Sequence, residues 1–156
     1  MKKSNLILCS VIEHDIDGVI RLKLEKEMLS LYKRHFGEGV SINVIWIEVP
    51  NGQAYQAGKL SKTATILCSV ENQLPQHQRV PFIEDVCELW HQHTAKPKNR
   101  LVVSAADEER VKYVISLSRD RVGGVRKVIV LLKMISQLLV SKLKRGYLSM
   151  NINLNA

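Results

Sequence analysis

The sequence predicts an α/β fold made of two tandem βαβ units. The pentapeptide Ile-Leu-Cys-Ser-Val occurs at Ile7–Val11 and again at Ile66–Val70. Each copy is followed by a helix-like stretch and then by a second apolar run, Val40–Val49 in the first half and Arg100–Ala105 in the second. The displacement from Ile7 to Ile66, here called the strand offset, also takes Val44 to Val103 inside these runs. Self-similarity at a fixed spacing is the mark of a repeated structural unit.

The first unit is expected to run strand, helix, strand. Leu6–Val11 is rich in aliphatic and β-branched residues, as strands are. Apolar residues then recur at helical spacing as far as Phe36, which predicts an amphipathic helix. Ser41–Val49 is predicted to be the second strand, and Gln53–Lys62 a loop or short hairpin after it.

The second unit repeats this order. Thr63–Val70 is its first strand, Pro75–His93 its helix and Arg100–Ala105 its second strand. Pro81 does not suit a helix interior, because it lacks a backbone N–H and disfavours helical geometry in the residue before it. The helix is therefore expected either to begin near Val80 or to kink there.

Crossover connections make parallel strand pairs and are right-handed in nearly all cases. Two such units side by side give a four-stranded sheet with two helices on one face. The strands are apolar on both alternating sets of positions, so the face without helices should also be buried. Packing against further copies of the chain would bury it, and the sequence therefore predicts an oligomer.

The chain is expected to divide into a tandem domain, residues 1–106, and a C-terminal extension, residues 107–156. The two units of the domain cover about residues 4–60 and 63–106.

The extension is predicted to be mostly helical. Asp107–Ser118 reads as a short helix and Val125–Arg145 as a longer one with an apolar stripe. The alternating tail, Tyr147–Asn153, can add to the sheet as an edge strand.

Positive charge is concentrated in this extension. The formal charge is +8, and residues 107–156 carry +6 of it, from ten Lys/Arg and four Asp/Glu. Three interpretations of the basic helix Val125–Arg145 stay open: packing of its stripe on the assembled protein, contact with an anionic membrane surface, or contact with nucleic acid. This helix contains no aromatic residue that could stack on bases, and the first one after it is Tyr147. No nucleic acid is therefore expected as a partner.

The composition favours a cytoplasmic protein. The mean hydropathy is −0.06, and no apolar run approaches the ~20 residues that a membrane-spanning helix needs. The cysteines, Cys9, Cys68 and Cys87, are odd in number and lack metal-ligand spacing, which fits a reducing compartment.

The tandem of short βαβ units resembles the tautomerase superfamily. In that family 4-oxalocrotonate tautomerase (4-OT) is the single-unit example, and the fused two-unit proteins are trimers. Ser41–Glu48, followed by Gly52–Tyr55 and Gly58, is similar to the family's strand and hairpin in spacing. The resemblance covers about residues 4–106 and implies a homotrimer.

The family's chemistry implies an amino-terminal proline as base, arginines that grip carboxylates, and an aromatic pocket wall. Here position 2 is Lys2, and the place of the proline falls near Ser4 in unit one and Thr63 in unit two. His14 and Asn43 fall where the family has arginines. The chain therefore departs from the family at each of these polar positions.

Five residues are the candidate site. Lys3 and His14 are the candidate catalytic groups, since a desolvated lysine or a histidine can carry a proton near neutral pH. Asn43, Tyr55 and Arg100 are the candidate substrate-binding groups.

The resemblance implies a small-molecule isomerase of tautomerase type, acting on a carbonyl or carboxylate compound without the usual proline base. The alternative is a non-catalytic binding or structural member of the same fold. No cofactor and no metal are expected, because the sequence has no Gly-rich phosphate loop, nucleophile elbow or zinc-ligand set.

Overall fold

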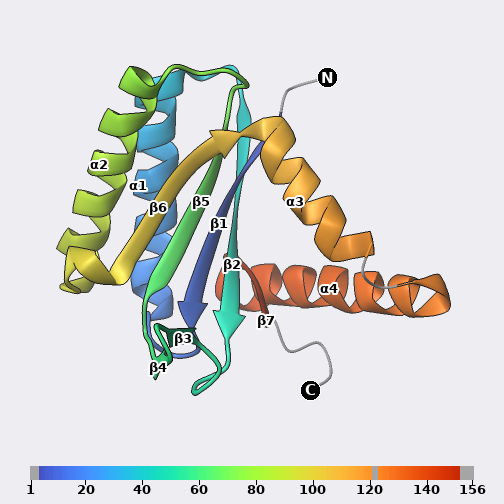
Figure 1. The fold of residues 1–156 in the computed structure, drawn as a ribbon. Helices are drawn as coiled ribbons and strands as arrows, with labels where there is room; N and C mark the ends of the chain where they lie inside the picture. The colour runs from blue at the N-terminus through green and yellow to red at the C-terminus, as the bar shows by residue number, and fades with distance from the viewer. Residues whose placement is uncertain (1–3, 121–122, 152–156) are drawn as a thin grey trace.

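The structure is a computed structural model and describes residues 4–120 and 123–151. It contains a five-stranded sheet in the order β6-β5-β1-β2-β7 and a small hairpin, β3-β4 (Figure 1). In chain order the elements are β1 (Ser4–Ile12), α1 (Gly18–Phe36), β2 (Ser41–Val49), β3 (Tyr55–Gln56), β4 (Lys59–Leu60), β5 (Ala64–Val70), α2 (Gln76–Thr94), a 3-10 turn (Lys98–Arg100), β6 (Leu101–Asp107), α3 (Glu108–Asp120), α4 (Gly124–Arg145) and β7 (Leu148–Asn151).

The two predicted βαβ units are confirmed. β1 pairs in parallel with β2, and β5 pairs in parallel with β6. The registers repeat as well, because Ile7 lies opposite Val44 and Ile66 lies opposite Val103, which are the same two positions moved by the strand offset. The units join through β1 and β5, which run antiparallel. The N-terminal end of β1 therefore lies beside the C-terminal end of β5.

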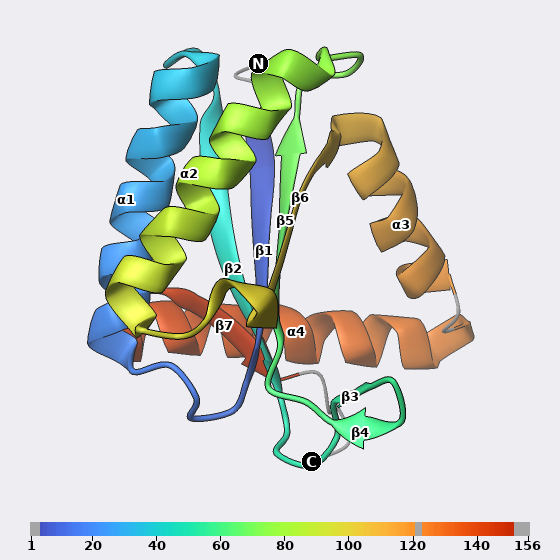
Figure 2. The same cartoon turned by 60° about the vertical axis from the view of Figure 1, so that its left-hand side comes forward.

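Helices α1 and α2 cover one face of this sheet, as the repeat predicts (Figures 1 and 2). The buried residues of α1 and α2 correspond at a displacement one residue shorter than the strand offset. This shorter displacement is here called the helix offset. The two helices therefore bury equivalent positions against the sheet. The corresponding pairs are Leu24 and Phe82, Met28 and Val86, Leu31 and Leu89, and Tyr32 and Trp90.

The change of offset arises in the loops between strand and helix. His14 and Gln73, which still correspond at the strand offset, both adopt a φ of 61°. Such a positive φ is uncommon for residues other than glycine. The same turn thus follows β1 and β5, and unit two is one residue shorter immediately after it.

Local signals account for the helix ends. Asp17 caps α1 by accepting a hydrogen bond from the Val19 N–H at 2.7 Å, and Gly37 ends the helix at a φ of 87°. α2 begins at Gln76 and continues through Pro81. The expectation of a start near Val80 is therefore wrong.

The C-terminal extension forms the predicted elements, two helices and an edge strand. β7 pairs in parallel with β2 and is the fifth strand of the sheet. The arm, defined as α3 and α4, lies on the side of the sheet opposite α1 and α2 (Figure 1). No helix among the described residues is long and apolar enough to cross a membrane.

The sheet face on that side, the open face, is apolar and incompletely covered. Leu6 and Leu8 of β1, Ile45 and Ile47 of β2 and Leu67 of β5 are half-buried, whereas their neighbours along each strand that face α1 and α2 are mostly buried. This matches the apolar patterning on both faces from which the sequence predicts self-association.

Candidate functional site

A buried arginine ties the start of α1 to the end of β2. Arg21 is 2% exposed, and its Nε donates to the Ile16 carbonyl at 3.0 Å. One terminal nitrogen reaches the Glu48 carboxylate at 2.5 Å. The guanidinium also lies 5.5 Å from the ring of Trp46 and 5.6 Å from that of Tyr147.

Unit two contains the same arrangement. The Nε of Arg79 donates to the Leu74 carbonyl at 2.7 Å, its guanidinium pairs with Asp107, and it donates to the Ala105 carbonyl at 2.9 Å. Since both units have this arginine–carboxylate pair, we assign it to the fold: it anchors the first turn of a helix to the end of the second strand.

The structure separates the residues that the sequence nominates as a site. Asn43 lies opposite Leu6 in the register, near the start of β1, and its side-chain amide donates to the Ser4 hydroxyl at 3.1 Å. His14, Tyr55 and Arg100 lie near the other end of β1. About six strand residues, or roughly 20 Å, separate the two ends. Asn43 therefore does not share a site with the other three within one chain.

The three residues at the far end are solvent-facing. The His14 side chain is 90% exposed and lies 3.7 Å from the Glu13 carboxylate. Tyr55 is 66% exposed on the β3-β4 hairpin, and Arg100 is exposed in the 3-10 turn before β6. Lys3 lies outside the described residues, so its proposed role stays a prediction.

A polar pocket, here called the strand-start pocket, lies where β1 begins and β5 ends. Its volume is about 200 Å³. It is closed by the last turns of α1, the loop before β2, the loop after β5 and the first turn of α2. Its lining residues are Asn5, Tyr32, His35, Phe36, Val40, Glu71, Leu74 and Gln78.

A chain of hydrogen bonds crosses the floor of this pocket. The Asn5 side-chain amide donates to the Tyr32 hydroxyl at 2.5 Å, and that hydroxyl donates to the Ser69 carbonyl at 2.9 Å. Asn5 is 4% exposed, yet its Oδ1 has no hydrogen-bond partner among the described residues. Buried polar atoms are nearly always paired, so an unpaired acceptor in a pocket wall indicates a place for a ligand or water donor.

Tyr32, in the middle of these hydrogen bonds, is held in its protonated form. Burial raises the pKa of the Tyr32 phenol above its ordinary value, and the hydrogen bond from Asn5 only partly opposes the shift. Its ring packs edge-on against Phe36 and Phe82, with centroid distances of 4.9 and 5.7 Å. Tyr32 is therefore a phenol that donates to the Ser69 carbonyl, and not a phenolate base, at neutral pH.

His35 brings an imidazole to the same pocket. Its Nε2 lies 2.7 Å from the Asp85 carboxylate on α2. A second pair has the same form. Its histidine, His93, corresponds to His35 at the helix offset, and its Nε2 lies 3.0 Å from Glu27 on α1. The two pairs cross between the helices in opposite directions, so part of the role of His35 is to join α1 to α2.

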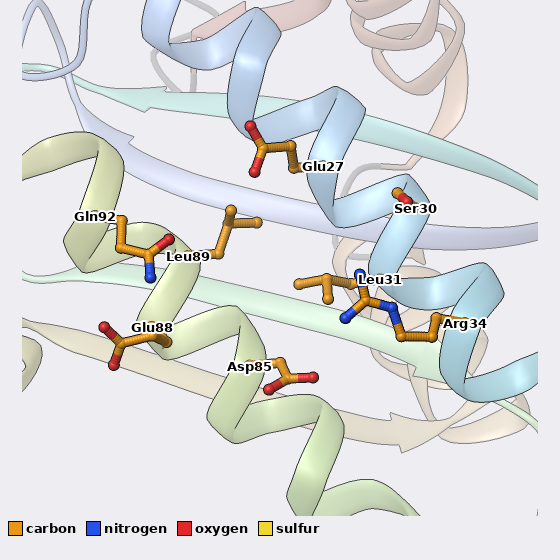
Figure 3. Close-up of a pocket in the computed structure, with 8 residues that line it drawn as sticks. All are labelled: Glu27, Ser30, Leu31, Arg34, Asp85, Glu88, Leu89 and Gln92. Atoms are coloured by element: carbon orange, nitrogen blue, oxygen red, sulfur yellow. The ribbon is translucent and has the colours of Figure 1, made fainter.

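A second hollow, of about 280 Å³, runs between the outer surfaces of α1 and α2 (Figure 3). Its carboxylates are already paired: Glu27 with His93, Asp85 with His35 and Glu88 with Lys98. Glu88 points away from α1 in Figure 3. No group of three or more metal-ligating side chains occurs in residues 4–120 or 123–151. We therefore interpret this groove as a solvated helix junction.

The sequence did not identify the strand-start pocket, although one signal was available. With the helices aligned at the helix offset, Tyr32 corresponds to Trp90, and with the strands aligned at the strand offset, Asn5 corresponds to Ala64. Both partners of the buried hydrogen bond in unit one are thus replaced by residues that cannot form it in unit two. This difference between the repeats distinguishes Asn5 and Tyr32 from residues that the fold requires.

Solved structures with a similar fold include fused 4-OT proteins and a member of the cis-3-chloroacrylic acid dehalogenase family. No protein-family model matches the sequence, and no curated protein matches it significantly. Native Ps01740 superposes with a TM-score of 0.63 at 22% identity, covering 65% of this chain and 92% of its own. N1, a member of the cis-3-chloroacrylic acid dehalogenase family, gives 0.61 at 14% identity, covering 65% and 73%. A fused 4-OT in a symmetric trimer gives 0.59 at 12% identity, covering 65% and 84%.

These likenesses establish a fused, tautomerase-like fold, as the sequence resemblance implies. About a third of this chain lies outside each of them. At such low sequence identity these likenesses show the fold alone. The function depends on the residues of the site.

Proposed function

We propose that the chain binds a small carbonyl compound in the strand-start pocket and interconverts its enol and keto forms. The observation that supports this most is the unpaired, buried Asn5 Oδ1 beside the Tyr32 hydroxyl. An enol hydroxyl can donate to Asn5 Oδ1, while the Tyr32 hydroxyl, whose own proton goes to the Ser69 carbonyl, holds the Asn5 amide in place. The fold alone supports the reaction class only by analogy.

The proton carrier in this proposal is His35. Asp85 holds its Nε2, which leaves Nδ1 to take the proton of the enol hydroxyl and return it to the substrate carbon as C=C becomes C=O. A histidine can do so near neutral pH. The reaction then needs no amino-terminal proline. Lys3 and His14 stay predictions from the sequence for the same role.

Among the described residues the lining of the pocket includes Glu71 and no Lys or Arg. The predicted binding residues Asn43, Tyr55 and Arg100 lie outside the pocket and would act only if assembly brought them to it.

The test is ketonisation of phenylenolpyruvate and 2-hydroxymuconate. We expect rates above buffer for the native chain, and a loss of about 10²-fold or more for His35→Gln. Lys3→Ala and His14→Ala are matched controls that separate the pocket from the sequence-based candidates. Rates equal to buffer, or loss in the controls alone, would contradict the proposal.

A non-catalytic binding role is the second candidate. It is favoured by the repetition of the His35–Asp85 pair as His93–Glu27, which shows that such a pair also occurs away from the pocket. A thermal-shift screen with small keto acids and neutral ketones separates the two: stabilisation by a ligand that is never turned over supports binding alone.

We further propose that the chain assembles as a homotrimer in the cytoplasm. The half-buried apolar side chains of the open face and the trimeric fused 4-OT neighbour support the assembly. The unpaired thiols of Cys9, Cys68 and Cys87 support a reducing compartment. Light scattering at micromolar concentration tests the assembly, and a monodisperse species of 17.7 kDa would contradict it.

A further inference from the structure

The arm connects opposite edges of the sheet. α3 follows β6 directly, and α4 leads into β7 through Gly146, whose φ of 81° and hydrogen bond to the Lys142 carbonyl end the helix. β6 and β7 are the two edge strands. The arm therefore leaves one edge and returns to the other on the side of the open face, and within the chain α4 packs mainly on β7 (Figure 1).

The arm carries an unusually large exposed apolar surface. Taken together, its exposed apolar side chains amount to an area on the order of 1,000 Å², compared with about 800 Å² per partner in a standard interface and roughly 300–600 Å² for the largest patch on a typical monomer. These side chains, each 41–87% exposed, are Tyr113, Val114, Ile115 and Leu117 of α3, and Val128, Ile129, Leu131, Leu132, Ile135, Leu139, Val140 and Leu143 of α4.

Part of this surface is a continuous stripe. Val128, Leu132, Ile135, Leu139 and Leu143 follow one another at spacings of three and four residues, which places them on one side of α4. A helix of this length extends for about 33 Å. A stripe this long can cross several strands or helices of a partner.

Charge indicates which partner surface it meets. Six Lys and Arg and no acid occur in α4, whereas residues 1–106 carry both signs of charge, eleven Asp and Glu beside thirteen Lys and Arg. Two α4 helices packed together would bring like charges close. The body of a second copy offers both apolar strand surface on the open face and acidic groups. One such contact exists within the chain, where Arg145 lies 3.5 Å from Glu48.

We infer that the apolar stripe of α4 is buried against the body, residues 4–107, of a second copy of this chain. This inference rests on the proposed assembly and names the element that holds it together. The arm and the open face lie on the same side of the molecule (Figure 1), so a second copy can cover both. The arm is then an assembly element added to the tautomerase-like fold.

Leu132→Glu/Leu139→Glu is the variant that tests this. Both residues are exposed in the single chain, so a folded protomer is expected. We expect light scattering to show about three times the chain mass for the native protein and for the control Lys144→Glu, which makes the same change of charge away from the stripe, and the mass of one chain for the double variant. A native trimer whose double variant is also a trimer overturns the inference and leaves the proposed assembly intact, whereas a native monomer overturns both.

A labelling measurement covers the case in which the glutamates prevent folding. Leu132→Cys and Lys144→Cys, which lies away from the stripe, are compared in a Cys87→Ser background by their rates of reaction with a maleimide dye. We expect Leu132→Cys to react at least tenfold more slowly at micromolar concentration. Equal rates overturn the inference. It is also overturned if the intact chain binds vesicles of anionic phospholipid in a salt-sensitive way that requires Leu132 and Leu139, while trimer formation does not require these two residues.

Discussion

The two βαβ units have the same framework and different ends. Both use an arginine–carboxylate pair to fix the first helical turn, Arg21 with Glu48 and Arg79 with Asp107. At the start of the first strand they differ, since the Asn5–Tyr32 hydrogen bond of unit one has no counterpart in unit two. A feature that one unit lacks without losing its fold is not required by that fold. The comparison therefore separates residues that hold the structure from residues available for function.

The largest effect is expected from the shared framework. Arg21→Ala leaves Glu48 without its main partner in a largely buried position, and removing one member of a buried pair costs about 3–5 kcal/mol. Urea denaturation measures the change in the free energy of unfolding.

The comparison sharpens this prediction through two matched variants. Arg79→Ala should cost less than Arg21→Ala, because Arg79 and Asp107 are more exposed. Lys98→Ala, which breaks an exposed pair with Glu88, should cost less than about 1 kcal/mol. An Arg21→Ala effect no larger than that of Lys98→Ala would refute the framework role.

The next effect concerns the difference between the units. Tyr32→Phe deprives the Asn5 amide and the Ser69 carbonyl of their partner, and we expect a loss of about 1–3 kcal/mol in the free energy of unfolding. Asn5→Ala/Tyr32→Phe makes unit one apolar at this point, as unit two is. The double variant should be more stable than Tyr32→Phe, since Asn5 is no longer left unpaired.

Calorimetric melting of the native chain, Asn5→Ala, Tyr32→Phe and the double variant completes the cycle. Strictly additive losses would mean that the two residues are not coupled. A double variant whose loss in stability equals the sum of the two single losses would therefore contradict the interpretation of Asn5 and Tyr32 as a coupled pair.

A smaller, pH-dependent effect is expected at Glu25, which belongs to unit one alone. Burial raises the pKa of its carboxyl above the ordinary value, and the positive charge of Lys142 partly opposes the shift. A raised pKa means that the folded chain binds a proton more readily than the unfolded chain. Stability should therefore fall as the pH rises from the ordinary carboxyl pKa through the raised one.

Glu25→Gln removes this titration. We expect the variant to be more stable than the native chain at pH 7.5 and to lose part of the pH dependence between pH 4 and 7. Urea midpoints across that range test it, with the exposed Glu27→Gln as control. The same pH dependence in Glu25→Gln as in the native chain would rule out the assignment.

The smallest effect concerns the repeated cysteines, which should behave alike. Burial raises the pKa of the Cys68 thiol to about 12 and that of Cys9 well above its ordinary value. Both should stay unreactive toward a thiol reagent at pH 8 until the chain unfolds, with Cys87 reacting first. Fast labelling of Cys9 or Cys68 in the native chain would show that the sheet opens.

Much of the fold could be predicted from the repeat. The four strands of the two units, the helices α1 and α2 between them, and α3, α4 and β7 of the extension follow from hydrophobic period and turn residues, which are local signals. The antiparallel meeting of β1 and β5 could not be predicted, because βαβ logic fixes pairing inside each unit and not between them. That orientation decides which strand ends meet, and so it places the Asn5 end of β1 beside the end of β5 that leads into α2.

The site was harder to predict for a related reason. The strand offset, used alone, pairs Lys3 with Lys62 and hides the correspondence of Arg21 with Arg79 and of Tyr32 with Trp90, which needs the shorter helix offset. The one-residue difference lies in a loop, where length varies with little cost. The unpaired Oδ1 of Asn5 depends on three-dimensional contacts, so no sequence pattern reveals it.

The account's central claim is that the Asn5–Tyr32 pair belongs to a ligand site. The most direct test is the initial rate of phenylenolpyruvate ketonisation by the native chain and by Asn5→Ala/Tyr32→Phe, both checked for folding by circular dichroism. We predict catalysis by the native chain and a rate equal to buffer for the folded double variant. A folded double variant that matches the native rate, or a native chain that matches buffer, would contradict the claim.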